Sequence, residues 1–339
     1  MSYAVPIVAL DPRAVHRSDD LGFPFSPVAV GDYLVVLNVY SPPHIHVLHT
    51  ETGALVGAFG GSGRGPGEYL APISASLEPG SRDLVWVNDP NQGRLTLVSL
   101  ARMLAGADPV VLMKIIEYPG LRQVLRTPDD RFLASSASGA YRFALIDGDG
   151  RIEARLGDSV DHAEDVPASI AGQAEEALIA LHPERDLIAA AGIRTGRLLI
   201  HDYNGRPVDT AETPFDLTPR FRVGRRSGQP SLVPGADMRY GYLSLAVTAT
   251  RIFALYSGQT RGEGNSRDIG GTDIHVFDWD GTLLGVYQLA VSMVGIAVSD
   301  DGETVFAVRL SDDPSVWTAR LPPLPTNHLT AATHPYDRP

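Results

Sequence analysis

Arginine side chains gather in one stretch of this sequence, between residues 216 and 242. A guanidinium group can donate two parallel hydrogen bonds to a carboxylate or a phosphate, so such a cluster could bind an anionic ligand. The same arginines could instead form ion pairs with acidic residues of nearby loops, and the sequence leaves both interpretations open. The candidate anion-binding residues are Arg64, from an earlier glycine-rich stretch, and Arg220, Arg222, Arg225 and Arg226.

A second set of candidate residues carries side-chain oxygen atoms. Asn88, Asp89 and Asn91 follow an apolar run, and Glu68 lies at the end of the glycine-rich stretch. Ca²⁺ prefers oxygen ligands, so the three residues after the apolar run, together with Asn38 of the first repeat, could hold a calcium ion. Glu68 could instead point at the axial opening and contact a polar ligand. No cofactor is predicted, because only the first two of the repeats described below carry suitable residues; Ca²⁺ stays an alternative.

The composition excludes several kinds of chemistry. The chain of 339 residues has no cysteine, so it has no disulfide, no thiol nucleophile and no cysteine-ligated metal. Its net charge of −12 argues against a broad surface for nucleic acid or for an anionic membrane. No apolar run approaches the roughly 18 residues of a membrane-spanning helix. Because the first residues lack the pattern of a signal peptide, we expect a soluble protein, cytoplasmic as the sequence stands and exported if a leader has been removed.

Six short segments share a pattern along the chain: a small or apolar residue, then usually an apolar one, then a turn pair. Each is followed by a β-rich run, and several units also contain a tight turn with glycine, which is a hairpin signal. Four antiparallel strands repeated about every 45 to 65 residues are typical of β-propeller blades. The sequence therefore predicts an all-β fold, a six-bladed β-propeller of four-stranded antiparallel blades. The six segments are residues 29–32, 76–79, 125–128, 180–183, 246–249 and 297–300.

The last repeat contains only three expected strands before Pro322 and Pro323. Residues 4–9 are expected to supply the fourth strand, which would close the ring by pairing the N-terminal strand with the C-terminal blade. Closure of this kind removes two exposed sheet edges. We therefore predict one propeller domain over residues 1–321 and a proline-rich tail over residues 322–339.

Arg126 is an exception within the repeats. Its counterparts in the other five units are Val or Leu, at the end of the strand expected to lie closest to the axis. A charge at that depth needs a partner or water, because burial of an unpaired charge is unfavourable. Arg126 is therefore predicted to form an ion pair or to contact a ligand near the axis.

Two stretches resemble known repeat families. Residues 57–69 (GAFGGSGRGPGEY) resemble the blade-linking signature of the bacterial TolB-like six-bladed propellers. Residues 87–95 (VNDPNQGRL) are similar to an NHL-type repeat, in which an Asp, an Asn and an Arg lie in the loop between the second and third strands. The resemblance implies a six-bladed ring, often in exported or lipid-anchored proteins, and implies no particular activity.

Chain direction separates the two faces of such a ring. The links between strands two and three, and from strand four to the next blade, lie at one end of each blade; we call this end the long-loop face and the opposite end the short-turn face. The long-loop face carries the long connections, and a rigid scaffold with variable loops is where binding residues concentrate. These connections are residues 60–72, 157–176, 216–242 and 257–272.

The predicted function is binding of a ligand or partner by the long-loop face and the axial funnel. The expected partner is a small polar or anionic ligand, a glycan, a peptide or a protein, and no nucleic acid or integral membrane segment is expected. The alternative is a propeller enzyme, a metal-assisted hydrolase, lactonase or lyase, with its site in the funnel. The sequence assigns no catalytic or metal-binding residue for that alternative.

Overall fold

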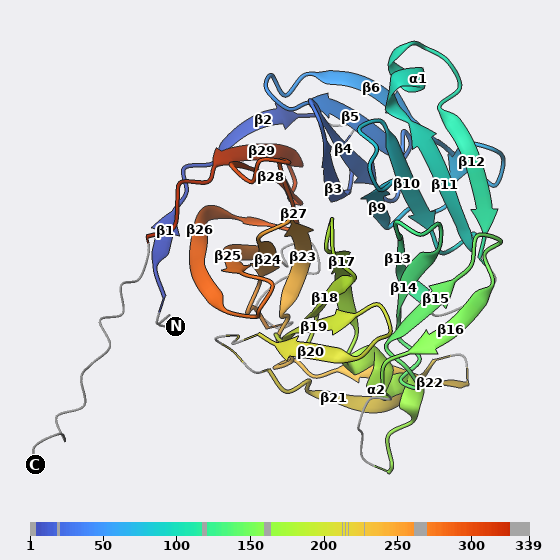
Figure 1. Ribbon diagram of the computed structural model, residues 1–339, viewed down its shortest axis with the longest axis vertical. Helices are drawn as coiled ribbons and strands as arrows, with labels where there is room; N and C mark the ends of the chain where they lie inside the picture. The colour runs from blue at the N-terminus through green and yellow to red at the C-terminus, as the bar shows by residue number, and fades with distance from the viewer. Residues whose placement is uncertain are drawn as a thin grey trace, which may run out of the picture.

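Six antiparallel sheets surround a central axis in the computed structural model of this protein (Figure 1). The structure describes residues 5–18, 21–116, 121–158, 164–211, 213, 215, 217–226, 228–260 and 270–325. In each sheet the chain starts at the axis and runs outward through successive hairpins. The six-bladed β-propeller predicted from the repeats is therefore confirmed.

The first three blades have four strands each. Blade 1 contains β3 (Pro24–Val30), β4 (Tyr33–Asn38), β5 (Ile45–His49) and β6 (Leu55–Phe59). Blade 2 contains β9 (Ser74–Leu77), β10 (Leu84–Asp89), β11 (Arg94–Ser99) and β12 (Val110–Ile115). Blade 3 contains β13 (Leu121–Arg126), β14 (Phe132–Ser136), β15 (Phe143–Ile146) and β16 (Ile152–Leu156).

The remaining blades continue the same order. Blade 4 contains β17 (Ala177–Leu181), β18 (Leu187–Gly192), β19 (Leu198–Asp202) and β20 (Pro207–Thr210). Blade 5 contains β23 (Tyr242–Val247), β24 (Ile252–Tyr256), β25 (Gly271–Phe277) and β26 (Leu283–Met293). Blade 6 contains β27 (Gly295–Val298), β28 (Thr304–Arg309) and β29 (Ser315–Arg320), and its fourth strand comes from the N-terminal part of the chain.

The N-terminal segment closes the ring, but with a different strand from the one expected. β2 (Arg13–Arg17) pairs antiparallel with β29, with Arg13 opposite Thr318. β1 (Ile7–Ala9) instead pairs in parallel with β26 and becomes a fifth strand of blade 5. The expectation that residues 4–9 complete the last blade is therefore wrong. β2 is the outermost strand of blade 6, and its two terminal arginines, Arg13 and Arg17, are exposed while the residues between them are half-buried.

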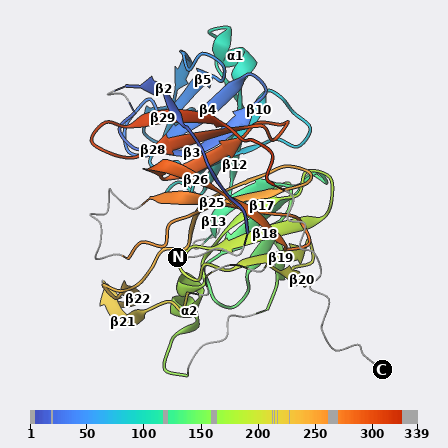
Figure 2. The same ribbon diagram turned by 90° about the vertical axis from the view of Figure 1, so that its left-hand side faces the viewer.

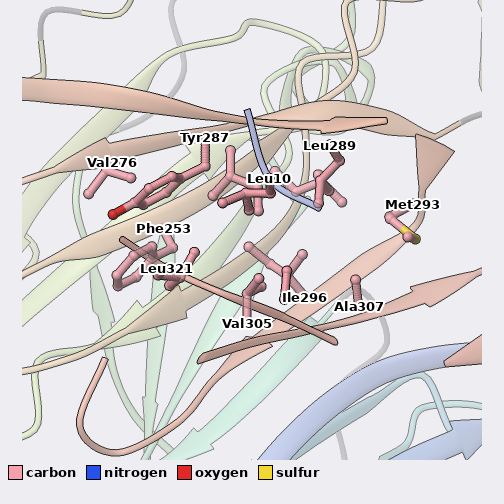
Figure 3. Packing of buried hydrophobic residues seen from close by; sticks show 13 residues of the cluster. Leu10, Phe253, Val276, Tyr287, Leu289, Met293, Ile296, Val305, Ala307 and Leu321 are labelled. Atoms are coloured by element: carbon pink, nitrogen blue, oxygen red, sulfur yellow. The ribbon is translucent and has the colours of Figure 1, made fainter. Parts of the chain in front are cut away.

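Six clusters of buried apolar side chains lie between neighbouring blades, one at each interface around the ring. Figure 3 shows the cluster between blades 5 and 6, where Phe253, Tyr287 and Ile296 pack together. Leu10 and Leu321, from the two ends of the propeller sequence, join the same cluster. Each fully buried large apolar side chain contributes roughly 1.5–3 kcal/mol, so these interfaces hold the blades together.

Polar bonds between innermost strands add to this packing. The Ser26 hydroxyl accepts a hydrogen bond from the Ala75 amide at 2.9 Å, which joins blades 1 and 2. The Ser244 hydroxyl accepts one from the Ile296 amide at 3.0 Å, which joins blades 5 and 6. Ser26 has a φ of +46° at a bulge of β3. This left-handed conformation is uncommon outside glycine, and here it accompanies the bond to the neighbouring blade.

Three of the connections between blades carry their own secondary structure. β7 (Gly61–Ser62) and β8 (Glu68–Tyr69) lie between blades 1 and 2, α2 (Ala168–Ala174) lies between blades 3 and 4, and the hairpin of β21 (Phe221–Arg226) and β22 (Gln229–Pro234) lies between blades 4 and 5. Seen edge-on in Figure 2, α2 and the hairpin lie on the same side of the ring, and α2 contacts β22. The other helix, α1 (Leu100–Leu104), lies in the outer turn of blade 2. Within the described parts of the chain, no helix has the length and apolar character needed to cross a membrane.

The predicted tail begins against the ring. The Tyr287 hydroxyl donates a hydrogen bond to the Pro322 carbonyl at 2.5 Å, and Leu324 packs against the cluster between blades 5 and 6. Residues 326–339 lie outside the described residues. The division of the chain at residue 322 stays a prediction.

Candidate functional site

A cavity of about 510 Å³ lies on the axis, and all six innermost strands line it. It reaches from the middle of these strands to the turns that follow them, so it lies toward the short-turn face. Its volume falls in the range of small-molecule sites, roughly 300–1,000 Å³. Small side chains line the wall where the strands converge, at equivalent positions of five blades: Ala29, Ser76, Ala180, Ala246 and Ala297.

In blade 3 the equivalent position is Leu125, and the next residue, Arg126, also lines the cavity. Its Nη2 atom lies 2.6 Å from the Asp130 carboxylate, and its Nε atom lies 3.7 Å from the Glu78 carboxylate. The guanidinium carbon also lies 4.8 Å from the centre of the Phe132 ring. The ion pair expected for Arg126 is therefore present, and the Arg126 side chain is only 12% exposed.

Glu78 is held from two sides at the same wall. Its carboxylate accepts a hydrogen bond from the Trp86 indole nitrogen, and it faces the Arg126 guanidinium. The Trp86 ring meets the Phe132 ring edge-on, with centroids 5.1 Å apart. A carboxylate and a guanidinium are thus fixed next to each other on the cavity wall by aromatic packing.

Blade 4 supplies the polar groups of another part of the wall, Tyr203 and His182. The buried Tyr203 hydroxyl has no hydrogen-bond partner among the described residues. Burial raises the pKa of Tyr203 to about 12, and the carboxylates of Asp186 and Asp129 add to this shift. Tyr203 is therefore a neutral hydroxyl with an unused hydrogen-bond donor beside the cavity.

The His182 ring is held in a fixed position. Its Nδ1 atom accepts hydrogen bonds from the backbone amides of Glu184 at 2.9 Å and Arg185 at 3.0 Å. Its ring lies 4.6 Å from that of Trp279, measured between centroids. Burial, with the charge of Arg185, lowers the pKa of His182, so the neutral imidazole is favoured at the cavity.

Five of the residues predicted from the sequence lie in or beside the connection between blades 1 and 2, and four of them carry side-chain oxygen atoms. The buried Asp89 carboxylate accepts hydrogen bonds from the Leu70 amide at 2.6 Å and from the Gln92 side chain at 2.9 Å. The Asn88 side chain donates to the Arg122 carbonyl of blade 3 at 2.8 Å. Both side chains therefore hold blade 2 to its neighbours, while Asn91 is exposed. Glu68 turns back toward its own loop, where its carboxylate accepts from the Gly65 amide at 2.7 Å.

Arg64 is exposed, and its carbonyl accepts a hydrogen bond from a residue that the site prediction missed, Arg94. The buried Arg94 guanidinium also donates to the carbonyls of Gly65, at 3.1 Å, and Glu68. It lies 5.8 Å from the centre of the Tyr69 ring. Arg94 is the arginine of the NHL-type stretch, and its place in that stretch is the sequence feature that could have indicated this structural role.

The arginines of the β21–β22 hairpin, and Arg220 directly before it, face solvent. Arg220 pairs with Asp237 at 3.3 Å, with both side chains more than 60% exposed. Arg225 donates to the Gly228 carbonyl at 3.2 Å, and Arg222 and Arg226 are exposed. Exposed pairs of this kind contribute about 0–1 kcal/mol, so they leave the guanidinium groups accessible. None of the four arginines lines the axial cavity.

A second group that the sequence did not indicate lies on the long-loop face. The Glu176 carboxylate accepts from Arg122 at 3.0 Å and from Arg194 at 3.1 Å, and Glu176 is only 12% exposed. Arg122 lies near the start of β13, whereas Glu176 and Arg194 lie in two different connections, so no spacing in the sequence connects them. The structure thus places Arg126 at the opposite end of the axis from this group and from the other predicted residues.

Metal binding has no support from clustering in the described part of the chain. No group of three or more His, Asp or Glu side chains lies close enough together there to hold a metal ion. Asp89 and Asn88, two of the suggested Ca²⁺ ligands, use their side chains to bond protein groups. Calcium binding and the enzyme alternative stay predictions.

Six blades around an axial cavity with a mostly apolar wall and a few polar groups define a β-propeller with a candidate small-molecule site. Residues 22–301 match the family model described as TolB-like 6-blade propeller-like, and the chain belongs to this family. Its fold is similar to the crystal structure of a member of the DUF4221 family from Bacteroides vulgatus, with a TM-score of 0.59 and 11% sequence identity. The similarity covers 93% of this chain and 97% of that chain. No curated protein matches this sequence.

Proposed function

We propose that this propeller binds a small polar ligand, neutral or positively charged, in the axial cavity. The observation that carries the proposal is the composition of the cavity wall. The wall combines apolar side chains from all six blades with a few fixed polar groups, which is the usual composition of a small-molecule site. The unused Tyr203 hydroxyl supplies a hydrogen-bond donor, and the Glu78 carboxylate supplies an acceptor.

The charge of the wall indicates the sign of the ligand. Glu78, Glu184 and Asp300 line the cavity, and Arg126 is the one Lys or Arg side chain among its described lining residues. The Arg126 guanidinium is already paired with Asp130 and Glu78. An anion would therefore meet net negative charge, whereas an ammonium or hydroxyl group would find acceptors.

The proposed site is the axial funnel that the sequence predicts, at the end of the axis that lies toward the short-turn face. Binding on the long-loop face by the arginines of the β21–β22 hairpin stays a separate prediction, because those side chains lie outside the cavity. A carboxylate or phosphate ligand suits that face better than the axial cavity, since its exposed guanidinium groups are accessible.

Thermal melting with two sugars of the same skeleton tests the proposal. Glucosamine carries an ammonium group at neutral pH, and glucose is neutral. A ligand that binds only the folded state stabilises it, so glucosamine at about 100 times its Kd is expected to add about 2.7 kcal/mol. We expect both sugars to raise the Tm, and glucosamine to raise it more.

Three variants assign the effect to the cavity. Glu78→Gln and Tyr203→Phe are expected to abolish most of the shift with glucosamine, because each removes one polar group of the wall. Tyr40→Phe is the matched control, since Tyr40 is 71% exposed and does not line the cavity. Absence of a shift with both sugars, or an equal shift in all three variants, would contradict the proposal.

A further inference from the structure

The wall of the axial cavity differs between its two halves. Blades 5, 6 and 1 are neighbours in the ring and form one half, and blades 2, 3 and 4 form the other (Figure 1). All six innermost strands and the turns after them belong to the described residues, so the two halves can be compared along the whole length of the strands. Along this length, the lining side chains that can form hydrogen bonds belong to one half.

The half formed by blades 5, 6 and 1 is apolar along its strands. The lining side chains of β3, β23 and β27 are alanine, valine, leucine, isoleucine and one proline. The backbone at Ile296 is satisfied as well, because the Ser244 hydroxyl bonds its amide at 3.0 Å and its carbonyl at 3.3 Å. The polar lining side chains described for this half lie in the turns at the mouth, where Asp300 is exposed and the Thr248 hydroxyl accepts from the Arg251 amide at 3.1 Å.

The opposite half carries polar side chains from the inner end of the cavity to its mouth. Gln123 lies at the inner end, and its Oε1 atom accepts from the Ile179 amide at 2.8 Å. This bond fixes the amide group and leaves the two hydrogens on Nε2 without an acceptor among the described residues. Ser76 follows at mid-strand, where its hydroxyl has no hydrogen-bond partner in the described part of the chain. We call Gln123, Ser76, Glu78 and Tyr203 the polar stripe.

The two halves make opposite demands on a ligand. A ligand hydroxyl that faces the strands of blades 5, 6 and 1 loses its water and gains no side-chain partner, which is unfavourable. A hydrocarbon group in the same place removes apolar side chains from water, which is favourable. The polar stripe instead needs a group that donates or accepts hydrogen bonds.

A molecule with a polar head group and an apolar body meets both demands. On the basis of the proposed function, whose ligand class it specifies, we propose that the axial cavity binds an amphipathic primary amine or alcohol with a compact hydrocarbon body. The head group contacts the polar stripe, and the body lies against the strands of blades 5, 6 and 1.

Isothermal titration calorimetry of the full chain with two amines of one shape tests this class. Cyclohexylamine and 4-aminotetrahydropyran both carry an ammonium group at neutral pH, and in the second an ether oxygen replaces one methylene of the ring. We expect cyclohexylamine to bind with a Kd below about 1 mM and about tenfold more tightly than 4-aminotetrahydropyran, because the ether oxygen meets no donor side chain along the apolar half. Equal binding of the two amines, or tighter binding of 4-aminotetrahydropyran, overturns the proposal.

Variants of the apolar half assign this preference to the cavity. Val28→Thr and, independently, Val298→Thr keep the shape of the side chain and add a hydroxyl, so each should lower the preference for cyclohexylamine about threefold. Val111→Thr is the matched control, because Val111 is 45% exposed on β12 and lies outside the cavity. It should leave the preference unchanged. An unchanged preference in both Val28→Thr and Val298→Thr, or a lower one in Val111→Thr, contradicts the proposal.

Head group and body are separated by Glu78→Gln. This variant changes the polar stripe, so it should weaken both amines by the same factor and leave their ratio as it was; a changed ratio counts against the proposal. Glucosamine in the same titration distinguishes the two levels of inference. Binding of glucosamine without a preference between the two amines overturns the amphipathic class and leaves the proposed function in place, whereas no binding of any of the three overturns both.

Discussion

The two faces of the ring contain the same kind of charged group in opposite proportions. On the short-turn face, Arg126 lies between two carboxylates, those of Glu78 and Asp130. On the long-loop face, the Glu176 carboxylate lies between two guanidinium groups, those of Arg122 and Arg194. β13 contributes an arginine to each, near its start and at its end. One scaffold therefore presents sites of opposite charge, and the length of the loops does not indicate which face has the cavity.

The largest expected effect compares two aspartates that accept backbone hydrogen bonds. Asp89, on the long-loop face, is fully buried, and Asp147, in a turn of the short-turn face, accepts from the amides of Asp149 and Arg151 at 2.9 Å while exposed. Asp89→Ala leaves several buried donors unpaired and should lower the free energy of unfolding by about 4 kcal/mol. Asp147→Ala should cost much less, because water replaces its carboxylate. Urea denaturation of both variants measures the difference; equal losses would show that the two turns are equally important.

The next effect compares the two glutamates at the axis. Glu176→Gln leaves two arginines without their carboxylate and should lower the free energy of unfolding by about 3 kcal/mol. Glu78→Gln should cost about 1 kcal/mol, because Arg126 keeps its partner Asp130 and the amide can still accept from Trp86. The measurement is the midpoint of guanidinium chloride unfolding at constant m-value. A larger loss for Glu78→Gln would reverse the comparison.

As the pH is lowered, the buried interior should lose stability at a higher pH than the turns of the short-turn face. Burial lowers the pKa of both His201 and His275 to about 4, below the unfolded value near 6.5. Unfolded histidine binds more protons between these values, so the stability that both supply is present above pH 6.5 and is lost as the pH falls toward 4.

We expect a loss of about 3 kcal/mol for each of the two histidines over this range, since one pKa unit corresponds to about 1.4 kcal/mol, measured by urea denaturation in a pH series. The Arg151 amide holds the pKa of Asp147 below its usual value, so the short turns respond only at lower pH. His201→Leu should flatten the slope between pH 6.5 and 4, and His49→Leu serves as a control at a half-buried strand position. A slope that is unchanged in His201→Leu would show that the buried histidine is not responsible.

The smallest effect on stability is expected for Arg126→Leu. Leucine is the residue at the equivalent position of blades 2 and 4, so it fits the strand end, and the stability should change by less than about 1 kcal/mol. Glucosamine binding should become about threefold tighter, because the variant removes the cation from the cavity wall. Weaker binding of glucosamine would instead indicate that Arg126 contacts the ligand directly.

The repeats predicted the blades because each blade repeats one local pattern of hairpins. Glycine-containing turns have a clear signal, and the structure explains one of them through the bonds of Asp278 to the amides of Asp280 at 3.1 Å and Thr282 at 2.8 Å. The substitution of Arg126 into an apolar series was also visible in the sequence. Such features depend on neighbours in the chain, which a single sequence displays directly.

The features that could not be predicted depend on contacts between distant residues. The group around Glu176 joins a strand of blade 3 to two connections, and α2 packs closely on the connection between β14 and β15. The position of the axial cavity depends on which side chains fill the centre of the ring, and the lengths of the connections carry no information on that. The closing strand was misplaced for a related reason, since its partner β29 lies at the other end of the chain.

The pairing of β2 with β29 also has a consequence for folding during synthesis on the ribosome. Arg13 pairs with Thr318, and the two positions lie 305 residues apart in the chain. The sixth blade can therefore form completely only after β29 has been synthesised, and until then β2 has no partner strand. A chaperone that protects the nascent chain from aggregation would have to cover the unpaired edge of β2 until β29 pairs with it.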